Sequence, residues 1–186
     1  MPVIGIDPSF RGCGVSDGAH HLVVKTEPQD TDPNQAAAIT RRRREILAAI
    51  ADWMNVHHPN AEDVVLYIEA PAFGQASQAS HLYELGWLMH GFHHTLHHLI
   101  SGDIVKVVEV STTALRKWAT GKGNTPKDGM KLAVYKKFGI EFEQDPGCDK
   151  LFAFLLCKFG EGVEAGEIDF SASKLRGQKT RKKVTT

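Results

Sequence analysis

A short apolar stretch that runs directly into a carboxylate is the feature that most constrains this chain. Residues 3–7 are Val-Ile-Gly-Ile-Asp, and Pro8 and Ser9 follow. An apolar run of this length that a proline stops predicts a buried strand. An ionised Asp at the end of such a strand is costly unless a cation or hydrogen-bond donors meet it. Asp7 is therefore either a turn-capping residue, which Asp-Pro-Ser favours, or a member of a charged site.

A second stretch further along the chain ends in the same way. Residues 64–69 are apolar until Glu69, which predicts a central strand covered on both faces. A third acid, Asp149, follows Pro146 in the first turn of the last predicted helix, where the helix dipole favours a negative charge. If the two strands are neighbours, their terminal carboxylates converge. We therefore expect Asp7, Glu69 and Asp149 to share one pocket.

The remaining pattern predicts a mixed sheet flanked by helices. The dipeptide at residues 17–18 is Asp-Gly, a strong hairpin signal. In chain order we expect strands at 3–9, 10–16 and 21–25, then a helix capped by Thr31 or Asp32 and a strand at 64–69. A helix at 75–100 and a buried strand at 104–110 follow. Three helices complete the chain: one at 111–120, one that begins with a capping box at 125–128, and one that begins at 146. Three antiparallel strands followed by two strands reached through helical crossovers predict an α/β fold with a mixed five-stranded sheet. The carboxyl ends of the strands carry the chemistry in such sheets.

The long helix at residues 75–100 carries two different stripes. One is an apolar seam suited to packing on another helix or on a second subunit, formed by Leu82, Leu85, Met89, Phe92, Leu96 and Leu99. The other is formed by His90, His93, His94, His97 and His98. Two histidines four residues apart can share a zinc ion, but no acid or cysteine completes a ligand set nearby in the sequence. We interpret this stripe as a polar helix face or a dimer contact, which histidine titration would make sensitive to pH.

Length and composition fit one globular domain, with 186 residues, 42% hydrophobic and 24% charged. The formal net charge is +0, so overall basicity does not indicate nucleic acid. Two local basic segments, residues 41–44 and the acid-free tail from Lys174, are typical of contact with a polyanion. The 3 cysteines lack paired spacing, and neither a signal pattern nor a membrane-length apolar run is seen. These features predict a reduced, cytoplasmic protein without a membrane partner.

Three converging carboxylates raise one another's pKa values and destabilise a fold unless a cation neutralises them. Hard oxygen ligands without paired Cys or His indicate Mg²⁺ or Mn²⁺ rather than zinc. Two such ions about 3.5–4 Å apart would activate water and stabilise the leaving oxygen of a phosphodiester. The predicted chemistry is therefore two-metal phosphodiester hydrolysis.

Four segments together resemble the RuvC family of Holliday-junction resolvases, which belongs to the ribonuclease-H-like superfamily. They are GIDPS at residues 5–9, YIE at 67–69, GKGNTPK at 121–127 and CDKL at 148–151. The resemblance implies a homodimer that binds four-way DNA junctions by shape and nicks two opposing strands symmetrically with Mg²⁺ or Mn²⁺, two ions per site. It also implies a bacterial cell, or a bacterial host infected by a virus that encodes the protein.

The resemblance implies that Asp7, Glu69 and Asp149 bind the metal and take part in catalysis. The familiar bacterial members place a fourth acid, or a histidine, where this chain has Pro146. Asp145, one residue earlier, is at a spacing associated with virus-encoded members and is our candidate for the fourth metal ligand. Glu143 is the alternative.

DNA contact is carried over to Arg116 and Lys127, and to Phe73 either as an aromatic that stacks on a base near the junction point or as a simple loop anchor. Lys122 is an additional cation in the exposed loop, where it can meet a phosphate. We expect residues 1–160 to form the nuclease domain and residues 161–186 to form a polar, basic tail. Two other functions remain open at this point. An actin-like nucleotide-binding module starts with a similar strand but normally needs a second domain, and an architectural protein would bind junctions without cleaving them.

Overall fold

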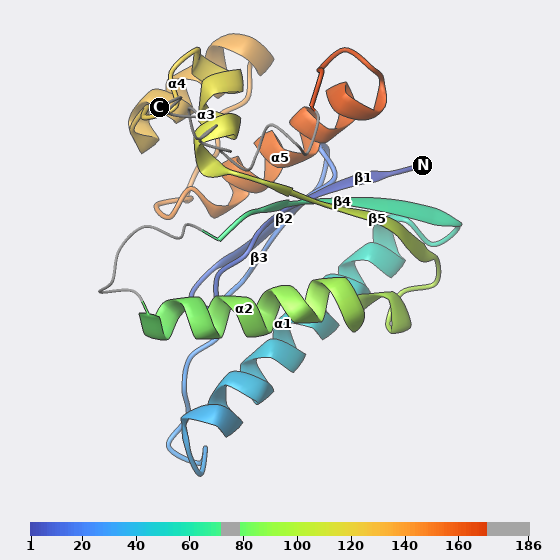
Figure 1. Cartoon of the computed structure of the whole chain (residues 1–186), viewed down its shortest axis with the longest axis vertical. Helices are drawn as coiled ribbons and strands as arrows, with labels where there is room; N and C mark the ends of the chain where they lie inside the picture. Colours follow the sequence, from blue (N-terminus) through green and yellow to red (C-terminus); the bar gives the residue numbers. More distant parts are fainter. Residues whose placement is uncertain (72–78, 171–186) are drawn as a thin grey trace, which may run out of the picture.

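A five-stranded sheet lies between two layers of helices in the computed structural model, which describes residues 1–71 and 79–170 (Figure 1). The elements are β1 (Val3–Asp7), β2 (Cys13–Ser16), β3 (His21–Val24), α1 (Gln35–His57), β4 (Asp63–Glu69), α2 (Ala79–His94), the 3₁₀ turn η2 (Leu96–His98), β5 (Asp103–Val110), α3 (Thr112–Thr120), α4 (Lys127–Phe138) and α5 (Asp149–Glu164). The strand order is β3-β2-β1-β4-β5. β1 pairs antiparallel with β2 and parallel with β4. The predicted mixed sheet is therefore confirmed.

Each face of the sheet has its own apolar core, and β4 contributes to both. Val64, Leu66 and Ile68 pack with residues of α1 and α2, whereas Val65 and Tyr67 pack with residues of α3, α4 and α5. All five side chains are buried. Successive residues of a strand point to opposite faces, so a strand covered on both sides must be apolar throughout.

The helix α5 lies directly on β1 and β2 because two strand positions are glycine. A Cβ atom at Gly5 would lie 2.0 Å from the carbonyl oxygen of Ala153, and one at Gly14 would lie 2.1 Å from that of Asp149. Real Cβ atoms do not approach backbone atoms so closely, so any side chain here would push the helix away from the sheet. The two glycines thus bring the first residue of α5 against the strands.

The start of α1 differs from the prediction. Asn34 is the N-cap, and its side chain accepts the Ala37 N–H at 2.9 Å. The predicted caps, Thr31 and Asp32, were wrong because the Asp32 carboxylate binds the Arg41 guanidinium at 2.8 Å instead. A nearby arginine therefore decides which of three capping-type residues caps the helix.

The capping box predicted for α4 was also wrong. Pro126 is the N-cap and makes no side-chain capping bond. The hydroxyl of Thr125 bonds instead to the hydroxyl of Thr120 at 2.6 Å and to the carbonyl of Lys122 at 3.0 Å. These contacts close the loop between α3 and α4, and the helix begins at Lys127.

The predicted burial of β5 needs correction, whereas the leucine seam packs against another helix, which is one of its two predicted uses. β5 is an edge strand, so part of it faces solvent, and Val105 is 52% exposed. The seam is not available to a second subunit, because Leu85, Met89, Phe92 and Leu96 pack into the chain's own core. α2 also ends at His94, earlier than predicted.

The arginine block at residues 41–44 serves mainly internal contacts. Arg41 binds Asp32 and Glu45, Arg42 is buried and donates to the carbonyls of Phe10 and Thr26, and Arg43 lies over the ring of Trp87. Arg44 is exposed. Arg41 and Arg42 are therefore bonded within the protein, whereas Nε and Nη1 of Arg43 are buried without a protein hydrogen-bond partner.

The domain boundary predicted at residue 160 falls within α5, which continues to Glu164. The chain then packs back, with Phe170 edge-on to Phe159 at 4.9 Å between ring centroids. The basic tail from residue 171 lies outside the described residues. Within residues 1–71 and 79–170, no helix has both the length and the apolar character needed to cross a membrane.

The predicted hairpin between β2 and β3 is present, and its turn is tied to the end of α1. The Asp17 side chain is 6% exposed, and its Oδ2 lies 2.9 Å from His20 Nδ1 and 3.0 Å from His58 Nε2. Burial alone would raise the pKa of Asp17, but hydrogen bonds from the His20 backbone, the His20 ring and the Ala19 N–H outweigh it and lower the pKa to about 2.

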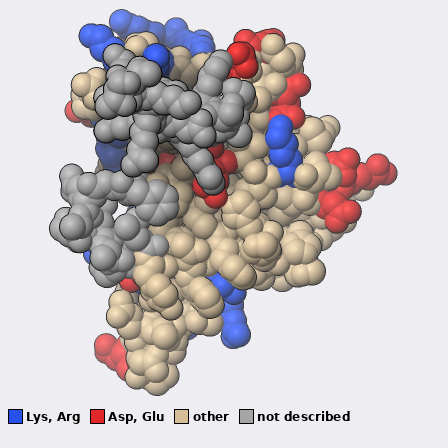
Figure 2. Space-filling view, in the orientation of Figure 1, with Lys and Arg blue, Asp and Glu red and all other residues tan. Residues whose placement is uncertain are grey.

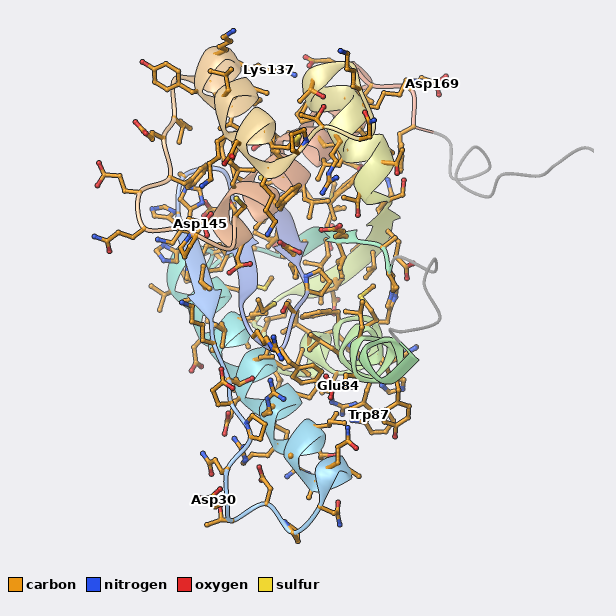
Figure 3. All side chains as sticks on the ribbon, turned by 90° about the vertical axis from the view of Figure 1, so that its left-hand side faces the viewer. Asp30, Glu84, Trp87, Lys137, Asp145 and Asp169 are labelled. Atoms are coloured by element: carbon orange, nitrogen blue, oxygen red, sulfur yellow. The ribbon has the colours of Figure 1, made fainter. Side chains whose placement is uncertain are left out.

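We expect Asp17→Asn to lower the free energy of unfolding by about 2 kcal/mol at pH 7, because the folded-state pKa lies below its ordinary value. This contribution is present above about pH 4 and is lost as the pH falls towards about 2. Urea unfolding of both proteins at several pH values measures it. Asp30→Asn, which alters an exposed loop acid (Figure 3), is the control. A stability difference that stays constant from pH 7 to pH 2.5 would contradict the assignment.

Candidate active site

Two of the predicted acids lie side by side at the carboxyl ends of the central strands. β1 and β4 are parallel neighbours with Ile6 opposite Ile68, so the next residues, Asp7 and Glu69, lie at the same edge of the sheet. The two side chains are close enough for Glu69 to raise the pKa of Asp7. The expected adjacency of the two strands is therefore confirmed.

The third acid reaches the same place through a gap left by two glycines. Asp149 is the first residue of α5, and its Oδ2 lies 2.4 Å from where a Cβ of Gly12 would be and 2.6 Å from where a Cβ of Gly147 would be. Alanine at either position would collide with the carboxylate. Gly12 and Gly147 thus form a cradle for Asp149 that we did not predict, although glycines in these two loops were the available signal.

Both Glu69 and Asp149 act electrostatically on Asp7. Burial, the charge of Glu69, the hydrogen bond to Glu69 and the charge of Asp149 all raise the pKa of Asp7 well above its ordinary value, and Lys127 partly offsets them. Burial and the charge of Asp145 raise the pKa of Asp149. Asp7 and Asp149 each have a pKa raised by a neighbouring acid, so the site disfavours full ionisation in the absence of a cation.

Two lysines flank the acids. Lys127 Nζ donates to the carbonyl of Gly147 at 2.6 Å, which holds the ammonium group at the edge of the cradle. Lys25, which directly follows β3, is exposed, and its charge lowers the pKa of Asp149 as that of Lys127 does. Lys127 was predicted to contact DNA, whereas Lys25 was missed because nothing in the local sequence distinguishes it from an ordinary surface lysine.

The carboxylate of Asp145, the predicted fourth metal ligand, accepts backbone N–H groups in this structure. Asp145 is 5% exposed and lies in the turn before α5 (Figure 3). Its Oδ1 accepts the Asp149 N–H at 2.9 Å, and its Oδ2 accepts the Leu151 N–H at 3.1 Å. Asp145 thereby satisfies the first N–H groups of α5 and fixes the backbone of Asp149. Glu143, the alternative ligand, is exposed.

The other predicted DNA contacts lie on the helical layer above the acids. The Arg116 guanidinium is 5.8 Å from the ring centroid of Phe152, and its Nε is buried without a protein hydrogen-bond partner. Lys122 is exposed in the loop between α3 and α4. Figure 2 shows Lys and Arg side chains gathered over this upper part of the molecule, with acidic side chains below them. Phe73 lies outside the described residues.

The donors suit a hard divalent cation, although the coordination shell is not complete. Among the described residues, no group of three or more His, Cys, Asp or Glu side chains is already arranged to hold a metal ion, and this includes the histidine stripe. The three acids offer carboxylate oxygens, which Mg²⁺ and Mn²⁺ prefer. Burial and the charges of Asp7 and Asp149 raise the pKa of the adjacent Cys13 thiol, so the site offers no thiolate.

Comparisons with known proteins identify the fold. No family model and no curated protein sequence matches the chain. A Thermus thermophilus RuvC structure is 24% identical, with a TM-score of 0.58, over 89% of this chain and 97% of that chain. T. thermophilus RuvC in complex with a Holliday junction substrate is 22% identical, with a TM-score of 0.59, over 88% and 96%. These matches give no support to a viral origin. They show that this chain has a RuvC-like, ribonuclease-H-like fold.

Proposed function

We propose that this protein is a metal-dependent, structure-selective DNA endonuclease that resolves Holliday junctions and related branched DNA by paired symmetric nicks. The observation that carries the proposal is the meeting of Asp7, Glu69 and Asp149 in one charged cluster at the carboxyl ends of β1 and β4. The similar fold of a RuvC protein that was solved with a Holliday junction substrate supports the choice of DNA.

The acids would hold one or two Mg²⁺ ions, with Mn²⁺ as a substitute. Such ions, when bound, supply an activated water molecule and charge stabilisation for the leaving oxygen of a phosphodiester. The chain's own residues have complementary tasks. The cradle of Gly12 and Gly147 keeps Asp149 close to the strands, and Asp145 fixes the backbone on which Asp149 sits.

The cations around the acids would hold the DNA backbone. Lys127 is tethered beside the cluster, Lys122 is exposed in the neighbouring loop, and Arg116 is half-buried on α3. Phosphate oxygens are natural acceptors for such donors, and contacts of this kind set the register of the DNA rather than its sequence preference. We propose that these three residues place the scissile phosphate over the acids.

A homodimer would place two such sites on one junction, and α2 offers a surface for it. Tyr83, Trp87, His90 and His94 recur at steps of four, three and four residues and are exposed, with Tyr83 at 62% and Trp87 at 38%. This is the spacing of a helix seam, and the leucine seam of the same helix is already buried. Figure 2 shows few charges over α2, and Figure 3 shows Trp87 on its outer side.

The direct test incubates purified protein with labelled four-way, three-way, flap and linear duplex DNA, with and without Mg²⁺. We expect symmetric nicking of the four-way junction that requires Mg²⁺. Asp7→Asn should lower the nicking rate more than about 100-fold, because loss of a metal ligand has a larger effect than loss of a group that only orients a ligand. The variant should still bind the junction. Wild-type protein that binds junctions without nicking them would indicate an architectural protein. Binding of ATP without DNA cleavage would indicate the actin-like alternative.

Asp7→Asn should also raise the melting temperature of the metal-free protein by a few degrees at pH 7–8. The raised pKa of Asp7 lowers the stability of the folded state as the pH rises from the ordinary pKa of an aspartate towards the folded-state pKa, and asparagine removes this cost. Mg²⁺ should stabilise the wild-type protein but not the variant, because binding to the folded state alone raises stability. Thermal unfolding with and without Mg²⁺ measures both effects. Asp30→Asn, at an exposed loop acid, should behave as wild type. Equal Mg²⁺ responses in Asp7→Asn and wild type would contradict the site.

Trp87→Glu should convert the dimer into a folded monomer, because it replaces a large apolar side chain of the proposed interface with a charged one. The new carboxylate would lie beside Arg43, whose guanidinium is 4.8 Å from the Trp87 ring, so the variant retains a local partner. Sedimentation at one protein concentration measures the mass of each protein. Tyr135→Glu, at a 57% exposed position on α4, should remain a dimer. A monomeric wild type, or a dimeric Trp87→Glu, would exclude α2 as the interface.

A further inference from the structure

A threonine hydroxyl at the start of α3 contacts the candidate metal site, to which we did not predict that this helix contributes. The Oγ1 of Thr112 donates a hydrogen bond to Oε1 of Glu69. Thr112 is the first residue of α3, and 43 positions of the chain separate it from Glu69. The contact therefore results from the tertiary fold and not from a local turn.

The sheet register explains why the two residues meet. β4 and β5 are parallel with Glu69 opposite Val110, and the Ala70 N–H donates to the Val110 carbonyl at 2.8 Å. The two strands thus end together, and the chain that leaves β5 turns into α3 next to the end of β4. Leu115, which is fully buried one turn into α3, anchors the helix in this position.

The two hydroxyl residues at this helix start have separate tasks. Ser111 is the N-cap, and its Oγ accepts the Ala114 N–H at 3.2 Å. The helix therefore does not need the hydroxyl of Thr112 as a cap, and that hydroxyl is directed to Glu69 instead. Because the hydroxyl donates its own proton, it can remain bonded to the carboxylate whether or not a cation is bound.

We infer that Thr112 is a positioning residue that holds the Glu69 carboxylate in place for a divalent cation. The inference rests on the proposed function and names a support that the RuvC resemblance did not assign. A free Glu side chain loses considerable rotamer entropy when it binds a metal, and a hydroxyl that already restrains it lowers that cost. Partners of this kind orient ligating carboxylates, and their loss typically weakens metal binding or activity.

The test measures Mn²⁺ binding by calorimetry in the full-length protein without DNA, and junction nicking as a function of Mn²⁺ concentration. Thr112→Val keeps the shape of the side chain but removes the donor, and it should weaken Mn²⁺ binding about 10- to 100-fold. Thr112→Ser keeps the donor and should bind Mn²⁺ as wild type does. Thr113→Val, at the exposed neighbouring threonine, is the matched control and should change neither measurement.

Each outcome separates this inference from the proposed function. If wild type binds Mn²⁺ and nicks junctions, and Thr112→Val does so with the same affinity, the positioning role is overturned and the nuclease proposal stands. Equal weakening in the Val and Ser variants would also overturn it, since the hydroxyl would not be the cause. Wild type that neither binds Mn²⁺ nor nicks junctions would refute the nuclease proposal itself. If Thr112→Val unfolds, Thr112→Ala supplies the second variant without a donor and should show the same loss of affinity.

Discussion

The contact between α5 and the strands is the constraint on which the site depends. Glycine at positions 5 and 14 lets the helix backbone touch the sheet, and glycine at positions 12 and 147 leaves room for the Asp149 carboxylate. With bulkier residues the helix would lie further from β1, and Asp149 would be separated from Asp7. The three acids are therefore brought together by the absence of side chains as much as by their own presence. Once the helix is seated, the parallel pairing of β1 and β4 supplies the other two carboxylates without further adjustment.

This arrangement opposes stability, because burial and the charges of Glu69 and Asp149 raise the pKa of Asp7. The structure contains supports that hold the acids despite that repulsion. Asp145 accepts two backbone N–H groups at the start of α5, Thr112 donates to Glu69, and Lys127 brings a positive charge to the edge of the cluster. The proposed cation would neutralise these acids, and the neighbouring groups would keep the carboxylates in place for it. This is the physical link between the fold and the proposed hydrolysis of a phosphodiester.

The sequence predicted the parts of this structure that depend on local pattern. The sheet follows from the apolar runs and their spacing, and Asp7 and Glu69 were recognisable because each ends such a run. Features that depend on contacts between distant segments were missed or wrong. Asp32 looked like a helix cap until Arg41 bound it, and the role of Thr112 exists only because β4 and β5 end together. The leucine seam of α2 could equally have faced a partner, and only the packed core shows that it faces inward.

The most direct measurement is anomalous X-ray scattering from crystals of the protein soaked in Mn²⁺. If the three acids form the metal site, the strongest anomalous peak lies between Asp7, Glu69 and Asp149, with carboxylate oxygens at about 2.0–2.2 Å, as expected for a small, hard divalent cation. A strongest peak at the histidines of α2, or no peak near the ends of β1 and β4, would contradict the assignment of these acids and the hydrolytic chemistry inferred from them.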